Sequence, residues 1–386
     1  MITTCCICGD ELRTAFSQSN EDILGMAHEY TQKIGICDAC GFIMTQNPFS
    51  EEQLANRYKT ESKFEYDVEG GHIFDATSEY AKRSRSQKTF VQDNTKDIQS
   101  MLEIGASSAY NLSLYNGIST RVGIEPSLAN CLSAKKKYGV DMFCGTYQEY
   151  EQKDSFDLIF LSMVLEHIVD PATFIQWCKV HNNKYMFIEV PLLDHKLLTE
   201  PFGMFAEEHV NYFTYEGLYN LMRTAGYGLV NARLEYNPHE RLPAGWPGID
   251  TIWEKGKPAE EIFPVISSAQ ILDHYIEANK KQLRKIQEKI HQIPNDVRLA
   301  VWGTGHHVSM LLVNTELGKK NIVKFYDSDA RKHKYTMHGK SIGAFSPEDL
   351  VENRIEAVLI GTYVFQNVIS TIINPYSEKV QVYTLY

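Results

Sequence analysis

The chain has 386 residues, of which 43% are hydrophobic and 23% are charged, and its net charge is −11. This length favours two or three compact units of ordinary globular composition. The negative charge argues against a basic nucleic-acid-binding surface, so we expect no nucleic-acid partner. No stretch approaches the ~20 apolar residues of a membrane span, and no leader pattern starts the chain. We therefore expect no membrane association and take the cytoplasm as the default location.

Residues 1–60 are expected to form a small domain of short strands and turns around clustered cysteines. Five of the eight cysteines lie in the first forty residues, and four of them form two Cys-x-x-Cys pairs: Cys5, Cys8, Cys37 and Cys40. Each pair places two thiolates on one side of a metal, and two pairs complete a tetrahedral site. The spacing predicts a structural Zn²⁺ site, in which Cys6 is an alternative ligand to Cys5.

Residues 75–232 alternate between strand and helix patterns. Four apolar runs have the length of strands and are bounded by turn or helix signals: MLEIG (101–105), RVGIE (121–125), FDLIFLS (156–162) and YMFIEVP (185–191). Such alternation predicts a parallel sheet covered by helices, which is a Rossmann-like α/β domain.

The remaining chain is expected to form a connector and a second α/β domain. In the connector, residues 233–297, a strand (IDTIWEK) is followed by a long helix that Ser267 or Ser268 could cap and that Pro294 ends. Residues 298–386 then repeat the α/β plan, because RLAVWGTG leads a strand into a glycine turn and two further apolar runs follow. We expect this to be a C-terminal Rossmann-like domain.

The first strand of the central domain ends in Glu103-x-Gly105, and roughly 20 residues later the next strand ends in Glu125. A glycine turn followed at this distance by an acid is typical of a site that binds a nucleotide ribose. The loop lacks the further glycines of a dinucleotide site, and small residues (Ala106, Ser107, Ser108 and Ala109) stand there instead.

Five blocks resemble, in their order, those of class I S-adenosylmethionine-dependent methyltransferases: EIG (103–105), GIEPS (123–127), FDLIF (156–160), LEHIVDP (165–171) and IEVP (188–191). S-adenosylmethionine has no pyrophosphate, so one glycine with small neighbours can suffice, whereas NAD would favour more glycines. The resemblance implies cofactor contacts from Glu103, Gly105, Ala106, Glu125, Pro126, Thr146, Glu166 and His167. A loop-stabilising role is the alternative for Glu166 and His167, and a Rossmann-like domain without a ligand is the alternative for the whole.

With the cysteine pairs included, the chain resembles the nucleotide-sugar (deoxysugar) C-methyltransferase family. The resemblance also rests on ICDACGFIMTQNPF (36–49), EPFGMFAEEHVNYFT (200–214) and VWGTGHHVSMLL (301–312). It implies an N-terminal zinc-binding domain, a central methyltransferase domain and a C-terminal Rossmann-like domain that binds substrate. The expected partner is a small molecule, a nucleotide-linked sugar, and the sequence does not set the oligomeric state.

The resemblance also implies catalytic roles for Glu208 and His209. In that family a base removes the proton next to a ketone, and His209 is our candidate base, with Glu208 orienting it or sharing the proton. Histidine suits this task because its pKa lies near the working pH. Substrate contacts are expected from Tyr212, Gly303, Gly305 and His306.

Ala206 stands where the family usually has a tyrosine, whose hydroxyl could stabilise developing charge. Tyr58, Tyr66 or Tyr80 could supply a hydroxyl instead. An O- or N-methyl acceptor would suit the Glu208–His209 pair equally well, and a non-catalytic binding protein on the same scaffold is a further alternative.

Overall fold

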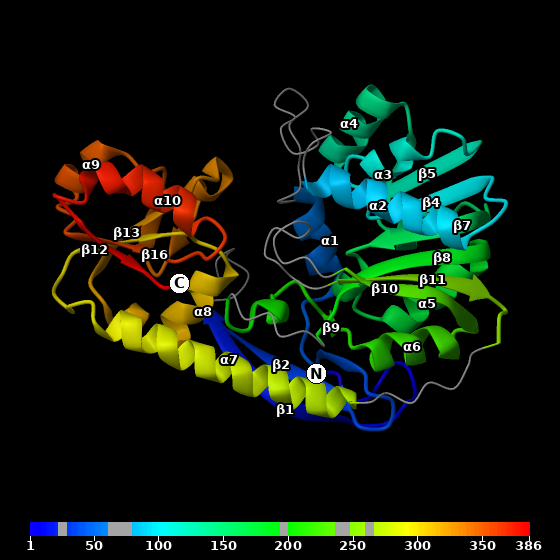
Figure 1. Ribbon diagram of the computed structural model, residues 1–386, viewed down its shortest axis with the longest axis horizontal. Helices are drawn as coiled ribbons and strands as arrows, with labels where there is room; N and C mark the ends of the chain where they lie inside the picture. Colours follow the sequence, from blue (N-terminus) through cyan, green and yellow to red (C-terminus); the bar gives the residue numbers. More distant parts are fainter. Residues whose placement is uncertain (22–28, 61–78, 194–199, 236–247, 259–265) are drawn as a thin grey trace. The chain divides into compact units, whose positions relative to one another are not determined.

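The computed structural model describes residues 1–21, 29–60, 79–193, 200–235, 248–258 and 266–386. The chain forms two compact units, each assembled from segments that are distant in sequence (Figure 1). The first unit comprises Met1–Arg13, Gly35–His195 and Glu208–Ile271, and the second comprises Thr14–Ile34, Lys196–Glu207 and Leu272–Tyr386. Residues 1–60 thus contribute to both units.

The first unit is built on a seven-stranded sheet in the order β10-β11-β8-β7-β4-β5-β6. Its strands are β4 (Ser100–Ile104), β5 (Thr120–Glu125), β6 (Asp141–Cys144), β7 (Phe156–Ser162), β8 (Asn182–Pro191), β10 (Tyr227–Glu235) and β11 (Gly248–Lys255). Strands β6, β5, β4, β7 and β8 pair in parallel, whereas β11 runs antiparallel to both β8 and β10. The predicted α/β class with a parallel sheet is confirmed.

Helices cover both faces of this sheet. The helices of the first unit are α1 (Glu51–Thr60), α2 (Glu79–Asn94), α3 (Tyr110–Leu114), α4 (Leu128–Tyr138), α5 (Pro171–Val180) and α6 (Tyr215–Thr224), with short turns η1 (Tyr147–Glu149) and η2 (Leu165–His167). Figure 1 shows α2, α3 and α4 on one side and α5 and α6 on the other. Side chains start three of these helices, because Ser127, Asp170 and Thr214 each accept a hydrogen bond from a backbone N–H of the first turn.

The core explains why the predicted strands are apolar throughout. Leu158 and Phe160 of β7 pack with Phe90 and Val91 of α2 and with Leu112 of α3. The other face of the sheet is covered as well, so six of the seven residues of β7 are buried. A strand that is buried on both faces needs a continuous apolar run.

The N-terminal strands are β1 (Leu12–Glu21), β2 (Glu29–Cys37) and β3 (Ile43–Thr45). Within the first unit, β3 pairs antiparallel with β9 (Asn211–Tyr212), so that Ile43 lies opposite Tyr212. This pairing fixes the segment that carries the Glu208–His209 pair against the N-terminal region.

The second unit contains a six-stranded sheet in the order β14-β15-β13-β12-β16-β17. Its elements are η3 (Gly203–Phe205), α7 (Ser268–His291), β12 (Leu299–Trp302), α8 (His306–Asn314), η4 (Glu316–Lys319), β13 (Ile322–Tyr326), η5 (Ala330–Lys334), β14 (Thr336–Met337), β15 (Lys340–Gly343), α9 (Pro347–Glu352), β16 (Ala357–Ile360), α10 (Gln366–Ile373), η6 (Asn374–Tyr376) and β17 (Gln381–Thr384); α7 starts within the first unit.

Alternate residues of β12 face opposite cores, as the two-residue period of a strand requires. Leu299 and Val301 pack in the cluster that contains residues of α7 and α8, whereas Ala300 and Trp302 pack in the cluster that contains residues of α9 and α10. Strands β13, β12, β16 and β17 are parallel, and β15 joins them in parallel beside β13. Among the described residues, no helix combines the length and the apolar character needed to cross a membrane.

Candidate active site

The order of the first sheet defines where a ligand can bind. From β4 the chain continues through β5 and β6 on one side and through β7 and β8 on the other. In open α/β sheets, ligands bind at the carboxyl ends of the strands where the strand order reverses. Gly105 follows β4, Glu125 ends β5 and Pro126 follows it, Thr146 follows β6, and Glu166 and His167 form η2 after β7. The predicted cofactor residues therefore lie at the same end of the sheet, where its parallel strands have their carboxyl ends.

The turn after β4 needs glycine at its first position. Gly105 has a φ of +68°, and a Cβ there would lie 2.6 Å from the Cγ2 atom of Val164. The amides of Gly105 and Ala106 donate hydrogen bonds to the carbonyl oxygen of Ile124, at 2.9 and 3.1 Å, which hold the turn against β5. A larger residue at position 105 would meet both backbone strain and a steric clash.

Ser107 and Ala109 adopt positive φ values of 49° and 60°, although neither is a glycine. The loop thus has the left-handed conformations that a glycine-rich loop would adopt more readily, and it retains them at an energetic cost.

The carboxylate of Glu125 fastens this loop to the end of β5. Its Oε2 accepts a hydrogen bond from the backbone N–H of Ser107 at 2.9 Å, and its Oε1 accepts one from that of Ser127 at 3.0 Å. The side chain is buried. A carboxylate has about four lone-pair positions, so a ribose hydroxyl could donate to those that remain.

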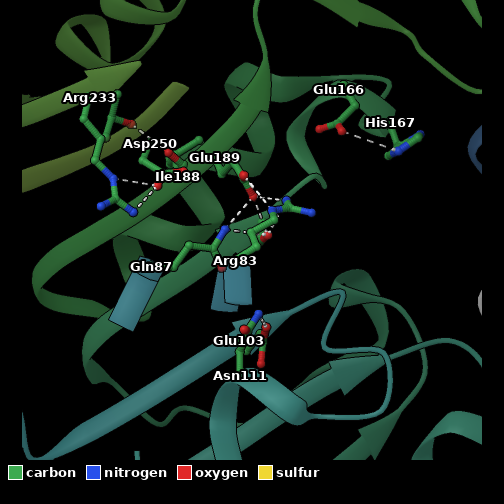
Figure 2. A network of polar contacts seen from close by, with 12 residues as sticks. Arg83, Gln87, Glu103, Asn111, Glu166, His167, Ile188, Glu189, Arg233 and Asp250 are labelled. Carbon is green, nitrogen blue, oxygen red and sulfur yellow. Dashed lines mark hydrogen bonds and ion pairs between the residues drawn. The ribbon is translucent and has the colours of Figure 1, made fainter. Parts of the chain in front are cut away.

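Several buried polar atoms around this loop have no hydrogen-bond partner. They are Glu103 Oε2, Ser107 Oγ, Ser108 Oγ, Asn111 Oδ1, Tyr115 Oη and, on β11, Asp250 Oδ1. The other Glu103 oxygen accepts a hydrogen bond from Asn111 Nδ2 at 2.8 Å (Figure 2). Burial raises the pKa of Glu103 to about 8. Buried acceptors and hydroxyls need partners, and the ammonium and ribose hydroxyls of S-adenosylmethionine would provide them, so the residues fit this cofactor.

A buried ion-pair network lies beside these atoms (Figure 2). Arg83 of α2 donates to both carboxylate oxygens of Glu189 and to the hydroxyl of Ser162, and Gln87 donates to Glu189 at 2.7 Å. Ser162 ends β7 and Glu189 lies near the end of β8, so the network joins two strand ends to α2.

Asp250, on β11, is a further buried acid of this region. Arg233 donates two hydrogen bonds to its Oδ2, at 3.0 and 2.8 Å. Burial, followed by the neighbouring charge of Glu189, raises the pKa of Asp250 to about 7. Sequence reasoning missed Arg83, Glu189 and Asp250 as site residues. For Glu189 and Asp250 the only signal in the sequence was an acid within an apolar strand pattern. For Arg83 there was none, since a lone arginine on a helix looks like any other surface cation.

The structure brings the Glu166–His167 and Glu208–His209 pairs together within the first unit. The rings of His167 and His209 have centroids 5.0 Å apart. The Nδ1 atom of His167 lies 3.0 Å from the carbonyl oxygen of Glu208. Figure 2 shows the second contact of this ring, in which Nε2 lies 3.8 Å from Glu166 Oε1. The two motifs therefore form one cluster at the end of β7.

Glu166 is buried, with an exposure of 1%, and neither of its carboxylate oxygens has a hydrogen-bond partner. Burial raises the pKa of Glu166 to about 8. Glu208, by contrast, has a cation nearby, because Arg57 Nη2 lies 3.8 Å from its Oε2. The two acids of the cluster thus have different electrostatic surroundings.

Of the three tyrosines expected to supply a hydroxyl, Tyr58 reaches this cluster. Its hydroxyl lies 3.0 Å from His167 Nδ1, and burial raises its pKa. Tyr80 lies instead near Arg83, which partly offsets the effect of burial on its pKa. Tyr66 lies outside the described residues.

Tyr212 supports the main chain of the candidate base. It is buried, and its hydroxyl donates to the carbonyl oxygen of His209 at 2.9 Å and lies 2.8 Å from Thr45 Oγ1. The structure therefore gives its hydroxyl protein partners on both sides.

The remaining predicted substrate residues are grouped within the second unit. Gly303, which has a φ of +111°, and Gly305 form the turn between β12 and α8, and His306 begins the helix. His306 Nδ1 lies 3.9 Å from Glu207 Oε1. Between the glycines, Thr304 donates a backbone hydrogen bond of 3.1 Å to Asp327, just after β13.

The four cysteines chosen from their spacing lie together. The Sγ atoms of Cys5, Cys8, Cys37 and Cys40 are all within 4.8 Å of one another, with separations of 3.5 Å for Cys5–Cys40 and 3.4 Å for Cys8–Cys37. A tetrahedral ion with Zn–S bonds of about 2.3 Å would hold its sulfurs about 3.8 Å apart. The set therefore fits Zn²⁺, and Cys6 is not a member of it.

Comparison with known proteins supports the assignment of the first sheet. Residues 70–232 match the model of a family described as a methyltransferase domain. A search of curated proteins found no match. The match, the strand order and the residues at the strand ends define a class I S-adenosylmethionine-dependent methyltransferase domain in this part of the chain.

Solved structures of methyltransferases resemble the chain more weakly. One from Clostridium acetobutylicum has 12% identity and a TM-score of 0.38, over 47% of this chain and 94% of that one. One from Methanosarcina mazei has 14% identity and a TM-score of 0.37, over 43% and 96%. A possible histamine N-methyltransferase from Thermotoga maritima has 19% identity and a TM-score of 0.36, over 45% and 89%. At these scores the similarity adds nothing to the family match.

Proposed function

We propose that the protein transfers a methyl group from S-adenosylmethionine to a nucleotide-linked sugar, with His209 and Glu208 handling the proton of the acceptor. The observation that carries this proposal is the cluster at the end of β7, where Glu208 and His209 lie beside Glu166, His167 and Tyr58. This is the edge of the sheet at which Gly105 and Glu125 would hold the cofactor.

The cofactor supplies an electrophilic methyl group on a sulfonium. Gly105 would permit its close approach to the backbone, Glu125 would accept hydrogen bonds from its ribose, and Glu103 would accept one from its ammonium group. Thr146, Ala106 and Pro126 would line the same pocket. Transfer is an in-line displacement, so holding the acceptor in line with the methyl group supplies much of the acceleration.

His209 would accept the proton that the acceptor loses. Next to a ketone this proton comes from carbon, and on a hydroxyl or ammonium group it comes from oxygen or nitrogen. Arg57 forms an ion pair with the carboxylate of Glu208, and Tyr58 adds a hydroxyl to the cluster. C-methylation is the choice that the family resemblance favours, and O- or N-methylation is the second candidate.

Two further parts of the chain have proposed roles. Gly303, Gly305 and His306 would bind a phosphate of the substrate, because the backbone N–H groups at the start of a helix attract anions. The cysteine cluster would bind a structural Zn²⁺, since four protein thiolates leave no open position on the metal.

The test is a mass-spectrometric assay in which nucleotide sugars are incubated with the full-length protein and S-adenosylmethionine. We expect one acceptor to gain the mass of a single methyl group. His209→Gln should lower that turnover by about 10²-fold or more and leave cofactor binding unchanged, because it removes only the base.

The matched control is His291→Gln, which alters an exposed histidine on α7. It should retain full turnover. If His209→Gln were as active as this control, His209 would not be the base. If no nucleotide sugar were methylated while another small molecule was, the acceptor class would be wrong.

A further inference from the structure

Glu166 is the most poorly satisfied acid of the candidate site. It has an exposure of 1%, and both of its carboxylate oxygens lack a hydrogen-bond partner. A buried acceptor without a donor is costly, so a group that would satisfy both oxygens is expected nearby. The imidazoles of His167 and His209 are near it, and the charges of Arg83 and Glu189 also act on it.

The hydrogen bonds of His167 determine which of its nitrogens faces Glu166. Its Nδ1 atom lies 3.0 Å both from the carbonyl oxygen of Glu208 and from the hydroxyl oxygen of Tyr58. Because the carbonyl oxygen can only accept, the tautomer that satisfies it carries the hydrogen on Nδ1, and the Tyr58 oxygen is then a second acceptor for that hydrogen. In the neutral ring the lone pair is then on Nε2, which lies 3.8 Å from Glu166 Oε1. A cation placed between Nε2 of His167 and Oε1 of Glu166 would be bound by both atoms.

His209 adds a third ligand. One ligand atom from each of Glu166, His167 and His209 lies within 4.8 Å of the other two. Two imidazoles and one carboxylate form a donor set that suits Zn²⁺, Fe²⁺ and similar divalent ions. The hydrogen bond from His167 Nδ1 to a carbonyl is also the support that metal-binding histidines ordinarily have.

We propose that Glu166, His167 and His209 bind a divalent transition-metal cation, for which Zn²⁺ is the probe. This site differs from the cysteine cluster in its donors, which are nitrogen and oxygen, and in its number of protein ligands. Three protein ligands leave at least one position on the metal open to water or to an acceptor oxygen.

The site has a consequence for turnover, and this consequence rests on the proposed function. A nitrogen of His209 that binds a metal cannot accept a proton at the same time. Excess Zn²⁺ should therefore inhibit methyl transfer reversibly, and a chelator should restore it.

The primary test is a count of bound metal that does not depend on turnover. Full-length wild type, Glu166→Gln and His209→Gln are dialysed to equilibrium against the same buffered Zn²⁺, and zinc per chain is measured by elemental analysis. Each variant should hold one zinc fewer per chain than wild type, because its three-ligand site binds Zn²⁺ at least about tenfold more weakly. Equal counts would overturn the proposal.

The absorption spectrum of bound Co²⁺ identifies which of the two sites has lost its metal in a variant. Thiolate-bound Co²⁺ gives intense ligand-to-metal charge-transfer bands, whereas nitrogen and oxygen ligands do not. The difference spectrum between Co²⁺-loaded wild type and Glu166→Gln should therefore contain d–d bands without thiolate bands. Thiolate bands in this difference would assign the lost metal to the cysteine cluster and overturn the proposal.

Two further variants protect the test against misfolding. Tyr58→Phe removes only the hydroxyl beside His167 Nδ1 and should weaken zinc binding about tenfold. Glu149→Gln alters an exposed acid on η1, which pairs with Lys59, and should keep the wild-type zinc count. Unchanged binding in Tyr58→Phe together with a loss in Glu149→Gln would contradict the assignment.

A zinc difference without methyl transfer would refute only the proposed function, and methyl transfer without a zinc difference would refute only the metal site.

Discussion

Three buried acids define the chemistry of the first unit at the scale of single residues. Burial raises the pKa of Glu103 and of Glu166 to about 8, and it raises that of Asp250 to about 7. Low-dielectric surroundings disfavour the charged form of a carboxyl group. Such shifts concentrate at functional sites, and these acids belong to β4, to β11 and to the turn η2 that follows β7.

The shift at Glu103 predicts a dependence of stability on pH. The carboxyl of Glu103 holds its proton up to about pH 8 in the folded protein, whereas the unfolded chain releases it near its ordinary value of 4.5. The folded state then binds more protons, so its contribution to stability is present below pH 4.5 and is lost as the pH rises through 8.

Glu103→Gln removes this titration and should flatten the fall in stability between pH 5 and 8, by on the order of a few kcal/mol. Urea unfolding at several pH values measures the effect. Glu254→Gln, at a half-buried acid on β11, is the control and should retain the wild-type slope. An equally steep slope in Glu103→Gln would show that Glu103 is ionised when folded.

Glu103 was predicted as a site residue with the help of its place at a strand end, Glu166 was predicted from the methyltransferase resemblance, and Asp250 and Arg83 were not predicted. Position after an apolar run is a local signal that one sequence displays. The pairing of Arg83 with Glu189 joins a helix to a strand far along the chain, and nothing local marks either partner. Tyr58 was one of three tyrosines that the sequence could not rank.

At the scale of elements, the loop after β4 shows how composition can mislead. Its residues predict few left-handed conformations, yet Ser107 and Ala109 both have positive φ. The hydrogen bond from the Ser107 amide to Glu125 compensates for part of the strain. Tertiary contacts thus hold a shape that the local sequence does not favour.

Ser107→Gly should raise stability by up to ~1 kcal/mol, because glycine adopts positive φ without the clash of a Cβ. It would also remove a buried hydroxyl that lacks a partner. Thermal unfolding measures the change. Ser113→Gly within α3 is the control and should lower stability by about the same amount. A loss of stability in Ser107→Gly would show that strain in this loop is negligible.

The strands of the central sheet were predictable because each is an apolar run of the right length. The segment IDTIWEK was also expected to be a strand, and it forms most of β11. Its antiparallel position between β8 and β10 could not be predicted, since strand pairing depends on contacts that are distant in sequence. The long helix was expected near Ser268 and extends to His291.

At the scale of the whole molecule, linear order and spatial order differ. Residues 14–34 and 196–207 belong to the unit that contains the C-terminal sheet, whereas the cysteines belong to the unit that contains the methyltransferase domain. Domains predicted from a sequence are consecutive segments, so the assignment of these segments to the two units could not be predicted. The α/β class itself was predictable, because alternating strand and helix patterns permit few other arrangements.

The central claim is that the first unit binds S-adenosylmethionine at the turn after β4. Isothermal titration calorimetry of the full-length protein tests it most directly, with Gly105→Val as the matched variant whose side chain would clash with Val164. We predict saturable binding of about one cofactor per chain for wild type, and at least tenfold weaker binding for Gly105→Val. No binding by folded wild type at high micromolar cofactor would contradict the account.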